Sequence, residues 1–194
     1  QEEYNFNTPI KLLYISTIDV YKHQKEVVKA VSMLNKNGFK ITFDIIGGSY
    51  KPEETELKKT ISEENAESYV NILGEIKYSN LPEEYQSRDI FVYASSCENL
   101  PNILIEAMAS GLPIACSNKG PMPEVLKDGG VYFNPEDFFS IYNALKKLIT
   151  SSNIRNEICI KSRKYAESYS WSKCTTETFN FLHHVKNKSL DHNK

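Results

Sequence analysis

The sequence lacks long apolar runs, clustered basic residues and internal repeats. No apolar segment approaches the ~20 residues that a membrane-spanning helix needs. The 23 Lys and Arg residues are balanced by 25 Asp and Glu residues, for a net charge of −2, without a basic run of the kind that binds nucleic acid. The lack of a long apolar run excludes a membrane-spanning helix in this sequence. The lack of basic runs and of repeats argues against a nucleic-acid-binding protein and a repeat protein.

Cysteine is scarce, and its four residues form no pattern. Cys97, Cys116, Cys159 and Cys174 have neither metal-type nor paired spacing, which is typical of reduced thiols in a cytosolic protein. Cys97, beside Glu98, is expected to be a small packed residue and not a reactive thiol. The length of 194 residues and the apolar fraction of 40% predict one globular domain with its own core. The chain begins at Gln1 without a methionine and enters a predicted strand early, which indicates a fragment excised from a longer protein.

Apolar strands alternate with helices along the chain. Strands are expected at 10–18, 40–46, 69–74, 90–94, 113–116 and 131–133, and helices at 22–37, 53–64, 80–87, 102–110, around 124, and at 137–150, 153–168 and 171–185. This order predicts an α/β fold with a Rossmann-like doubly wound parallel sheet. The Tyr and Phe residues are scattered through these elements, which favours packing over a stacking platform. Residues 1–9 are expected to be a polar lead, residues 10–185 the domain, and residues 186–194 a disordered tail.

Two acids lie in the loop and helix that follow the fourth expected strand. Glu98 is in the loop, and Glu106 lies about one turn into the helix, with seven residues between them. Ligands of an open parallel sheet bind outside the carboxyl ends of the strands, and ionised carboxylates accept hydrogen bonds from hydroxyls. The first-turn N–H groups between the acids are a place for a phosphate. The spacing therefore fits a ligand with hydroxyls at both ends and phosphate in the middle, although a solvated loop acid and an ordinary helix-face charge fit it too.

Three further segments end at the same predicted edge of the sheet. Lys22 is either a point charge for a phosphate or a solvated lysine at a helix start. Gly47-Gly48 lacks the G-x-G-x-x-G pattern, and no acid follows ~20 residues later as a dinucleotide site requires. We interpret these glycines as a tight turn that lets the backbone approach a ligand. The segment 74–77 after the third strand fits a plain turn by its spacing.

The segment E-N-L-P-N-I-L-I-E-A-M-A-S-G-L-P-I-A, which begins at Glu98, closely resembles the E-x7-E signature of family 4 retaining glycosyltransferases with the GT-B fold. The resemblance continues through 123–125 and 128–130 and covers most of the chain from Ile10 to about Val185. The family typically has Gly-Phe-Gly after the first acid, where this sequence has Asn99-Leu100-Pro101. Pro101 has no N–H, so the donor groups must come from other residues of the loop.

The resemblance implies the carboxyl-terminal, donor-binding domain of such an enzyme. It implies that Glu98 is the catalytic-site acid on the sugar hydroxyls, that Glu106 holds the ribose and that Lys22 holds the diphosphate. The other implied donor-binding residues are Gly48, Glu75 and Ile76, with the loop 74–77 near the base, and the loop residues Asn99, Leu100 and Asn102. The arginine that the family places on the diphosphate falls on Thr17, so half of that clamp is missing.

The resemblance also implies a partner set. The donor would be a nucleotide-diphosphate sugar, with no metal and no other cofactor, because fixed positive groups stabilise the leaving diphosphate. An amino-terminal acceptor domain, absent from this chain, would complete the enzyme and make any peripheral membrane contact at the inner face, so the fragment alone would be inactive. The expected setting is surface polysaccharide synthesis in the cytoplasm. The alternatives are a non-catalytic nucleotide-binding or partner module, which the missing arginine favours, and half of a GT-B sugar-nucleotide epimerase, against which the E-x7-E pair argues.

Overall fold

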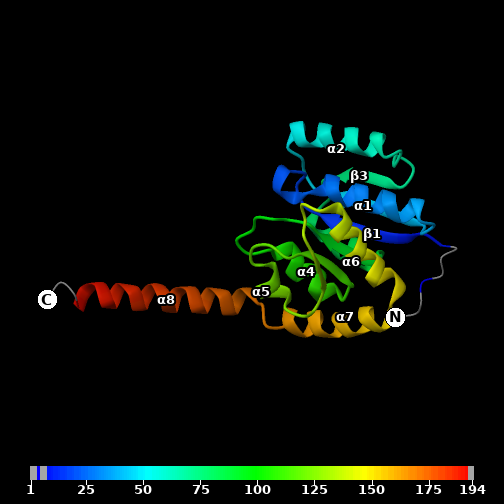
Figure 1. Cartoon of the computed structure of the whole chain (residues 1–194). Helices are drawn as coiled ribbons and strands as arrows, with labels where there is room; N and C mark the ends of the chain where they lie inside the picture. Colours follow the sequence, from blue (N-terminus) through cyan, green and yellow to red (C-terminus); the bar gives the residue numbers. More distant parts are fainter. Residues whose placement is uncertain (1–3, 5–7, 192–194) are drawn as a thin grey trace.

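The computed structural model of the chain describes Tyr4 and residues 8–191 (Figure 1). Six parallel strands form one sheet in the order β3-β2-β1-β4-β5-β6, which confirms the Rossmann-like doubly wound fold. The strands are β1 (Ile10–Ile15), β2 (Ile41–Ile46), β3 (Val70–Gly74), β4 (Ile90–Tyr93), β5 (Ile114–Ser117) and β6 (Val131–Phe133). The helices are α1 (Gln24–Lys36), α2 (Lys51–Glu63), α3 (Leu81–Gln86), α4 (Asn102–Ser110), α5 (Met122–Leu126), α6 (Phe138–Thr150), α7 (Ser152–Ala166) and α8 (Trp171–Asp191), with short 3-10 turns η1 (Val20–Lys22) and η2 (Tyr78–Asn80).

The strand order reverses between β1 and β4, which lie side by side at the centre of the sheet. β1 pairs with β2 from Ile10 opposite Ile41 to Ile15 opposite Ile46, and on its other side Leu12 pairs with Ile90 of β4. Open α/β sheets bind their ligands at such a switch point, outside the carboxyl ends of the strands. The loops after β1 and β4 are therefore the first place to look for a site.

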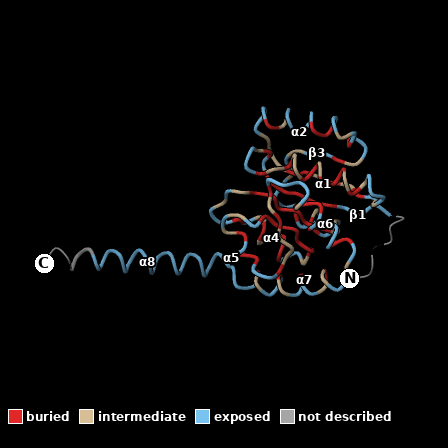
Figure 2. The backbone as a smooth tube through the Cα atoms, in the orientation of Figure 1, coloured by how far each residue is buried: buried red, intermediate tan, exposed pale blue. Residues whose placement is uncertain are grey.

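Helices cover the sheet in two layers. α1 packs against α2 and α6, and α4 packs against α3, α5 and α7. All four residues of β4 and of β5 are buried, because strands covered on both faces expose no polar side. Figure 2 shows the buried backbone concentrated in the sheet and in the inward faces of the helices.

The first strand and helix are shorter than the sequence predicts. β1 ends at Ile15, and only an isolated bridge between Ile18 and Ser49 continues its pairing with β2. The helix expected from residue 22 begins at Gln24, because Lys22 closes η1, whose first N–H is capped by Asp19. His23, in the left-handed region at φ 51°, separates the two turns.

The expected disordered tail is helical as far as Asp191. α8 runs from Trp171 without an internal glycine or proline to end it, and residues 192–194, like 1–3 and 5–7 of the expected polar lead, lie outside the described residues. The helix projects away from the body of the domain, and its described side chains are exposed (Figures 1 and 2). Trp171 is 75% exposed, so it does not belong to the core of this domain.

Candidate functional site

Lys22 and Glu98 meet at the switch point of the sheet. The Lys22 ammonium contacts Glu98 Oε1 as an ion pair and a hydrogen bond, and the two side chains are only 9% and 15% exposed. Lys22 comes from the loop after β1 and Glu98 from the loop after β4. The sequence predicted both residues at this edge but assigned them to different parts of a ligand, whereas in the structure each is the other's partner.

Glu98 accepts a second hydrogen bond on the same oxygen. The Tyr93 hydroxyl donates to Glu98 Oε1 over 2.7 Å, and neither Tyr93 nor Lys22 uses Oε2. Burial acts to raise the pKa of Glu98, but hydrogen bonds from Lys22, Ser95 and Tyr93 outweigh it and hold that pKa below its ordinary value. Glu98 is therefore an ionised acceptor at neutral pH.

Hydrogen bonds hold the two loops together. The Ser96 N–H donates to the Tyr21 carbonyl over 2.8 Å, and His23 Nε2 lies 2.9 Å from Ser96 Oγ. Below them, the Tyr14 hydroxyl donates to the Lys22 carbonyl over 2.7 Å and accepts from the Ala94 N–H over 3.2 Å. The positions of Lys22 and Glu98 are thus fixed by backbone contacts and not only by their own ion pair.

Glu106 lies on α4 with a separate set of partners. The Tyr78 hydroxyl donates to Glu106 Oε1 and the Tyr85 hydroxyl to Oε2, each over 3.2 Å. Because each carboxylate oxygen can accept two hydrogen bonds, both oxygens of Glu106 can accept one more from a ligand hydroxyl. Glu106 opens onto a cavity of about 450 Å³, which is lined by Tyr78, Leu100, Asn102, Ile105, Glu106, Tyr169, Ser170, Trp171 and Cys174.

The N–H groups between the two acids are only partly free. The Asn102 N–H donates to the Leu100 carbonyl over 2.9 Å, and the Leu104 N–H donates to the Pro101 carbonyl over 3.0 Å. Pro101, at the N-cap, offers no side-chain cap, and within the described chain the N–H groups of Asn99, Leu100 and Ile103 have no hydrogen-bond partner. The available donors therefore lie mainly in the loop, and the first turn of the helix is not the open cluster that its sequence predicts.

The backbone at position 47 requires glycine for a reason that the sequence did not show. Its φ is +140°, and a Cβ there would lie 2.3 Å from the Ser16 carbonyl oxygen. The glycine therefore lets the ends of β1 and β2 approach each other, in addition to the approach to a ligand that the sequence analysis predicts for this turn. A Cβ on Gly48 would meet Glu75 Oε1 at 2.5 Å, and both residues line a second cavity of about 420 Å³.

The remaining predicted residues lie along the same edge without direct contact to either acid. Thr17 is exposed, and its carbonyl accepts from Gln24 Nε2 over 3.0 Å. Ile76 is partly buried and packs against the core, and Asn99 is exposed beside Glu98. The structure thus brings Lys22 together with Glu98, Glu106 with Leu100 and Asn102, and Gly48 with Glu75.

Sequence reasoning missed the tyrosines and misjudged one cysteine. Tyr78, Tyr85 and Tyr93 contact the two acids, whereas the tyrosines as a group were interpreted as packing residues. The available signal was the position of Tyr93 at the end of a strand, two residues after Phe91 on the same face and just before the loop of Glu98. Cys97, expected to be a small packed residue, is exposed.

The described part of the chain shows neither a metal-binding cluster nor a helix that could span a membrane. Among these residues no group of three or more His, Cys, Asp or Glu side chains could hold a metal ion. None of the described helices is both long enough and apolar enough to cross a bilayer.

The chain is similar in sequence to glycosyltransferases. A family profile described as "Glycosyl transferases group 1" matches residues 1–165. The chain is 28% identical over 169 residues to the O-antigen chain mannosyltransferase B of Escherichia coli, covering 87% of this chain and 44% of that protein. It is 31% identical over 112 residues to the sulfoquinovosyl transferase SQD2 of Arabidopsis thaliana, covering 55% of this chain and 22% of that protein. The chain thus spans less than half the length of these relatives.

Solved structures share the fold. The Anabaena protein Alr3699/HepE in complex with UDP and glucose aligns with a TM-score of 0.82 at 17% identity, over 91% of this chain and 48% of that one. The C-terminal domain of a glycosyl transferase group 1 family protein (LpcC) from Francisella tularensis aligns with a TM-score of 0.70 at 22% identity, over 84% of this chain and 87% of that one. The Rossmann-like domain of this chain is therefore one found in glycosyltransferase structures.

Proposed function

Because the chain belongs to the glycosyl transferases group 1 family, we propose that it is the carboxyl-terminal, donor-binding domain of a family 4 retaining glycosyltransferase. It binds a nucleotide-diphosphate sugar, and an amino-terminal domain outside this chain presents the acceptor. The coverage of the relatives supports this division, since the chain matches 44% of the mannosyltransferase but 87% of the separate LpcC C-terminal domain.

One observation carries the proposal: two acids with different surroundings flank a loop with unpaired N–H groups at the carboxyl edge of the sheet. Glu98 lies at the switch point, and among the described residues Lys22 supplies the only ammonium that contacts it. Glu106 opens onto a cavity of about 450 Å³. The N–H groups of Asn99, Leu100 and Ile103 lie between the two acids in the chain, where they would donate hydrogen bonds to phosphate oxygens.

The roles follow from this layout. Glu106 accepts the ribose hydroxyls, Glu98 accepts hydroxyls of the transferred sugar, and Lys22 neutralises the diphosphate. Glu75 and Ile76 lie in the loop after β3, close to the base, and Gly48 lies beneath Glu75. The leaving diphosphate is stabilised by Lys22 and by the loop N–H groups, so this chemistry needs no metal and no further cofactor.

The cellular role is proposed from the relatives. A mannosyltransferase of O-antigen chains is among them, which favours surface polysaccharide synthesis for this protein as well. We place the protein in the cytoplasm, where its nucleotide-sugar donor would be available, and assign any contact with the inner face of the membrane to the amino-terminal half.

A second candidate is a non-catalytic nucleotide-binding module. Two observations favour it: Thr17 stands where the family has an arginine, and the Lys22 charge is already balanced by Glu98. In such a module the pocket would hold a nucleotide but no sugar would be transferred by the complete protein. An epimerase half stays the weaker alternative, because it gives no reason for the pair of acids.

Calorimetry with two variants tests the proposed layout. Glu106→Ala should weaken binding of the bare nucleoside diphosphate by about 10- to 100-fold, because a hydrogen bond to a charged acceptor contributes ~1.5–3 kcal/mol. Glu98→Ala should leave that affinity nearly intact and lower transfer by the full-length enzyme. Equal losses of nucleotide affinity in both variants would overturn the assignment of the two ends.

A further inference from the structure

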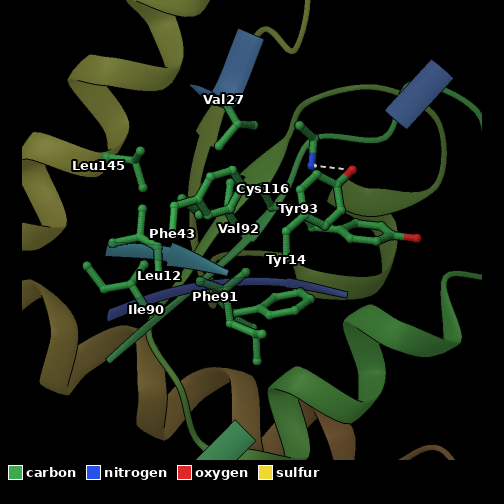
Figure 3. Close-up of a cluster of buried hydrophobic side chains, with 14 of the residues drawn as sticks. Leu12, Tyr14, Val27, Phe43, Ile90, Phe91, Val92, Tyr93, Cys116 and Leu145 are labelled. Atoms are coloured by element: carbon green, nitrogen blue, oxygen red, sulfur yellow. Dashed lines mark hydrogen bonds between the residues drawn. The ribbon is translucent and has the colours of Figure 1, made fainter. Parts of the chain in front are cut away.

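A row of four aromatic rings lies beneath the two acids. Tyr14 and Tyr93 have ring centroids 5.9 Å apart, Tyr93 and Phe91 6.1 Å, and Phe91 and Tyr85 5.8 Å. Phe91 and Tyr93 are two residues apart on β4, so they share one face of the sheet. Figure 3 shows Tyr14, Phe91 and Tyr93 together in the core. All four rings are at most 4% exposed, so neighbouring rings and the sheet hold them in place.

The row carries a hydroxyl to each acid. Tyr93, 1% exposed, donates to Glu98 Oε1 over 2.7 Å, and Tyr85, 4% exposed, donates to Glu106 Oε2 over 3.2 Å. Phe91, between them, has no hydroxyl; its ring stacks on that of Tyr93 at an interplanar angle of 18° and meets that of Tyr85 at a tilt of 53°. The two carboxylates are therefore tied to one rigid unit, although they belong to a loop and to a helix.

We propose that Tyr93 and Tyr85 are positioning residues, each of which orients one acid of the donor site: Tyr93 holds Glu98 for the sugar, and Tyr85 holds Glu106 for the ribose. This rests on the proposed function. Both tyrosines are at most 4% exposed and neither lines the cavity of about 450 Å³ beside Glu106, so each would act through its carboxylate. Burial, together with the neighbouring carboxylate, raises the pKa of both phenols, so they stay protonated donors throughout the working range.

A purely structural role makes a different prediction. Buried hydroxyls are normally hydrogen-bonded, and a tyrosine that only satisfies its own hydroxyl would affect stability without changing recognition. If the tyrosines position the acids, each hydroxyl should influence one part of the ligand and not the other. Two parallel single-atom deletions can separate these possibilities.

The variants are Tyr93→Phe and Tyr85→Phe, compared with Glu98→Gln and Glu106→Gln. Tyr142→Phe is the matched control, since its hydroxyl contacts Asn37 and neither acid. The probes are UDP, GDP and ADP with UDP-glucose, GDP-mannose and ADP-glucose, measured by calorimetry. The increment in affinity from nucleotide to nucleotide sugar reports the sugar subsite. Trp171, the single tryptophan, lines the same cavity as Glu106 and supplies an independent fluorescence signal.

We expect the two Phe variants to affect different parts of the ligand. Tyr93→Phe should reduce the sugar increment about tenfold, the effect of one lost hydrogen bond to a charged group, and leave the bare nucleotide within about twofold. Tyr85→Phe should weaken the bare nucleotide about fivefold and leave the sugar increment unchanged. The Tyr142→Phe variant should match the wild type for both ligands.

The pH dependence provides a second readout. Lys22, Tyr14, Tyr21 and Tyr93 are the charged and titratable groups around Glu98, and His23 lies one contact away through Ser96. Removing the Tyr93 hydroxyl should raise the pKa of Glu98, so the acid limb of the sugar increment should move to higher pH.

The outcomes distinguish the two levels of the proposal. If Glu98→Gln loses the sugar increment and Glu106→Gln loses nucleotide affinity while both Phe variants keep the wild-type affinities and pH profile, the tyrosines are structural and the proposed function stands. If the Gln variants also bind like the wild type, or if the wild-type chain shows no sugar increment, the roles of the acids fail and the positioning proposal fails with them. Should Tyr93→Phe not fold, as judged by circular dichroism, the loss in Tyr85→Phe alone decides for or against positioning.

Discussion

Replacing Lys22 by methionine isolates the charge at the centre of the site, since methionine keeps most of the apolar stem. Glu98 would then retain Tyr93 and Ser95 as neutral donors but lose its cation. Both side chains of the pair are at most 15% exposed, so solvent screens the interaction little. Removing one partner of a buried pair costs about 3–5 kcal/mol, and because two neutral donors to Glu98 remain we expect a smaller loss, about 2–3 kcal/mol.

The expected loss depends on pH. In the wild type the lowered pKa of Glu98 means that its ionised form stabilises the fold above the ordinary glutamate pKa, and that this contribution is lost as the pH falls through the lowered value. Without Lys22, burial opposes ionisation with fewer compensating contacts, and the pKa rises. The difference in stability between variant and wild type should therefore be largest near pH 7.5 and shrink as the pH approaches 4.5.

Urea unfolding of Lys22→Met, Glu98→Gln and the double variant measures the coupling directly. We expect a coupling energy of about 2 kcal/mol at pH 7.5. Lys36→Met is the matched control, because Lys36 also pairs with a glutamate, Glu64, but is 64% exposed, and it should change stability little. Additive single effects at Lys22 and Glu98, or a loss that is independent of pH, would refute the buried-pair reasoning.

Three further predictions concern the site and its frame. Lys22→Ala should weaken binding of a nucleoside diphosphate more than binding of the monophosphate, measured at one ionic strength. Thr17→Arg should strengthen diphosphate binding, because it restores a bidentate donor. Equal losses of affinity for both ligands in Lys22→Ala would make Lys22 a structural residue. Gly47→Ala should destabilise the domain by roughly 3 kcal/mol or more, because the new Cβ would lie 2.3 Å from the Ser16 carbonyl oxygen. Gly38→Ala is the control: its Cβ would have no atom within 4 Å, and we expect a loss of about 1 kcal/mol, both measured by thermal unfolding. The isolated chain should bind nucleotide without transferring sugar, and robust turnover in a radiolabelled transfer assay would contradict the absence of the acceptor half.

The order of strands and helices was predictable because apolar periodicity and turn residues are local. The helix at 102–110 and the strand at 131–133 were predicted to the residue, since Pro101 and Gly111 mark the ends of the first and charged or glycine residues precede the second. The end of β1 was not predictable in the same way. It depends on the approach of Gly47 to Ser16, a contact between segments thirty residues apart in the chain.

The location of the two acids was predictable from the sequence, but their contacts were not. The spacing of Glu98 and Glu106 placed both acids near the carboxyl edge of the sheet. Their partners come from other elements, Lys22 from the loop after β1 and Tyr85 from α3, and only the packed sheet brings these together. Tyr93 shows the limit most clearly, because the same alternation that buries its ring in the core also directs its hydroxyl to Glu98.

The most direct test of the donor-binding claim is a crystal structure of this chain soaked with UDP, GDP and ADP. The account predicts one bound nucleotide at the carboxyl edge of the sheet, with ribose hydroxyls on Glu106 and phosphate oxygens beside the N–H groups of Asn99 and Leu100. A nucleotide bound with its ribose away from Glu106, or no density at this edge with millimolar ligand, would contradict it.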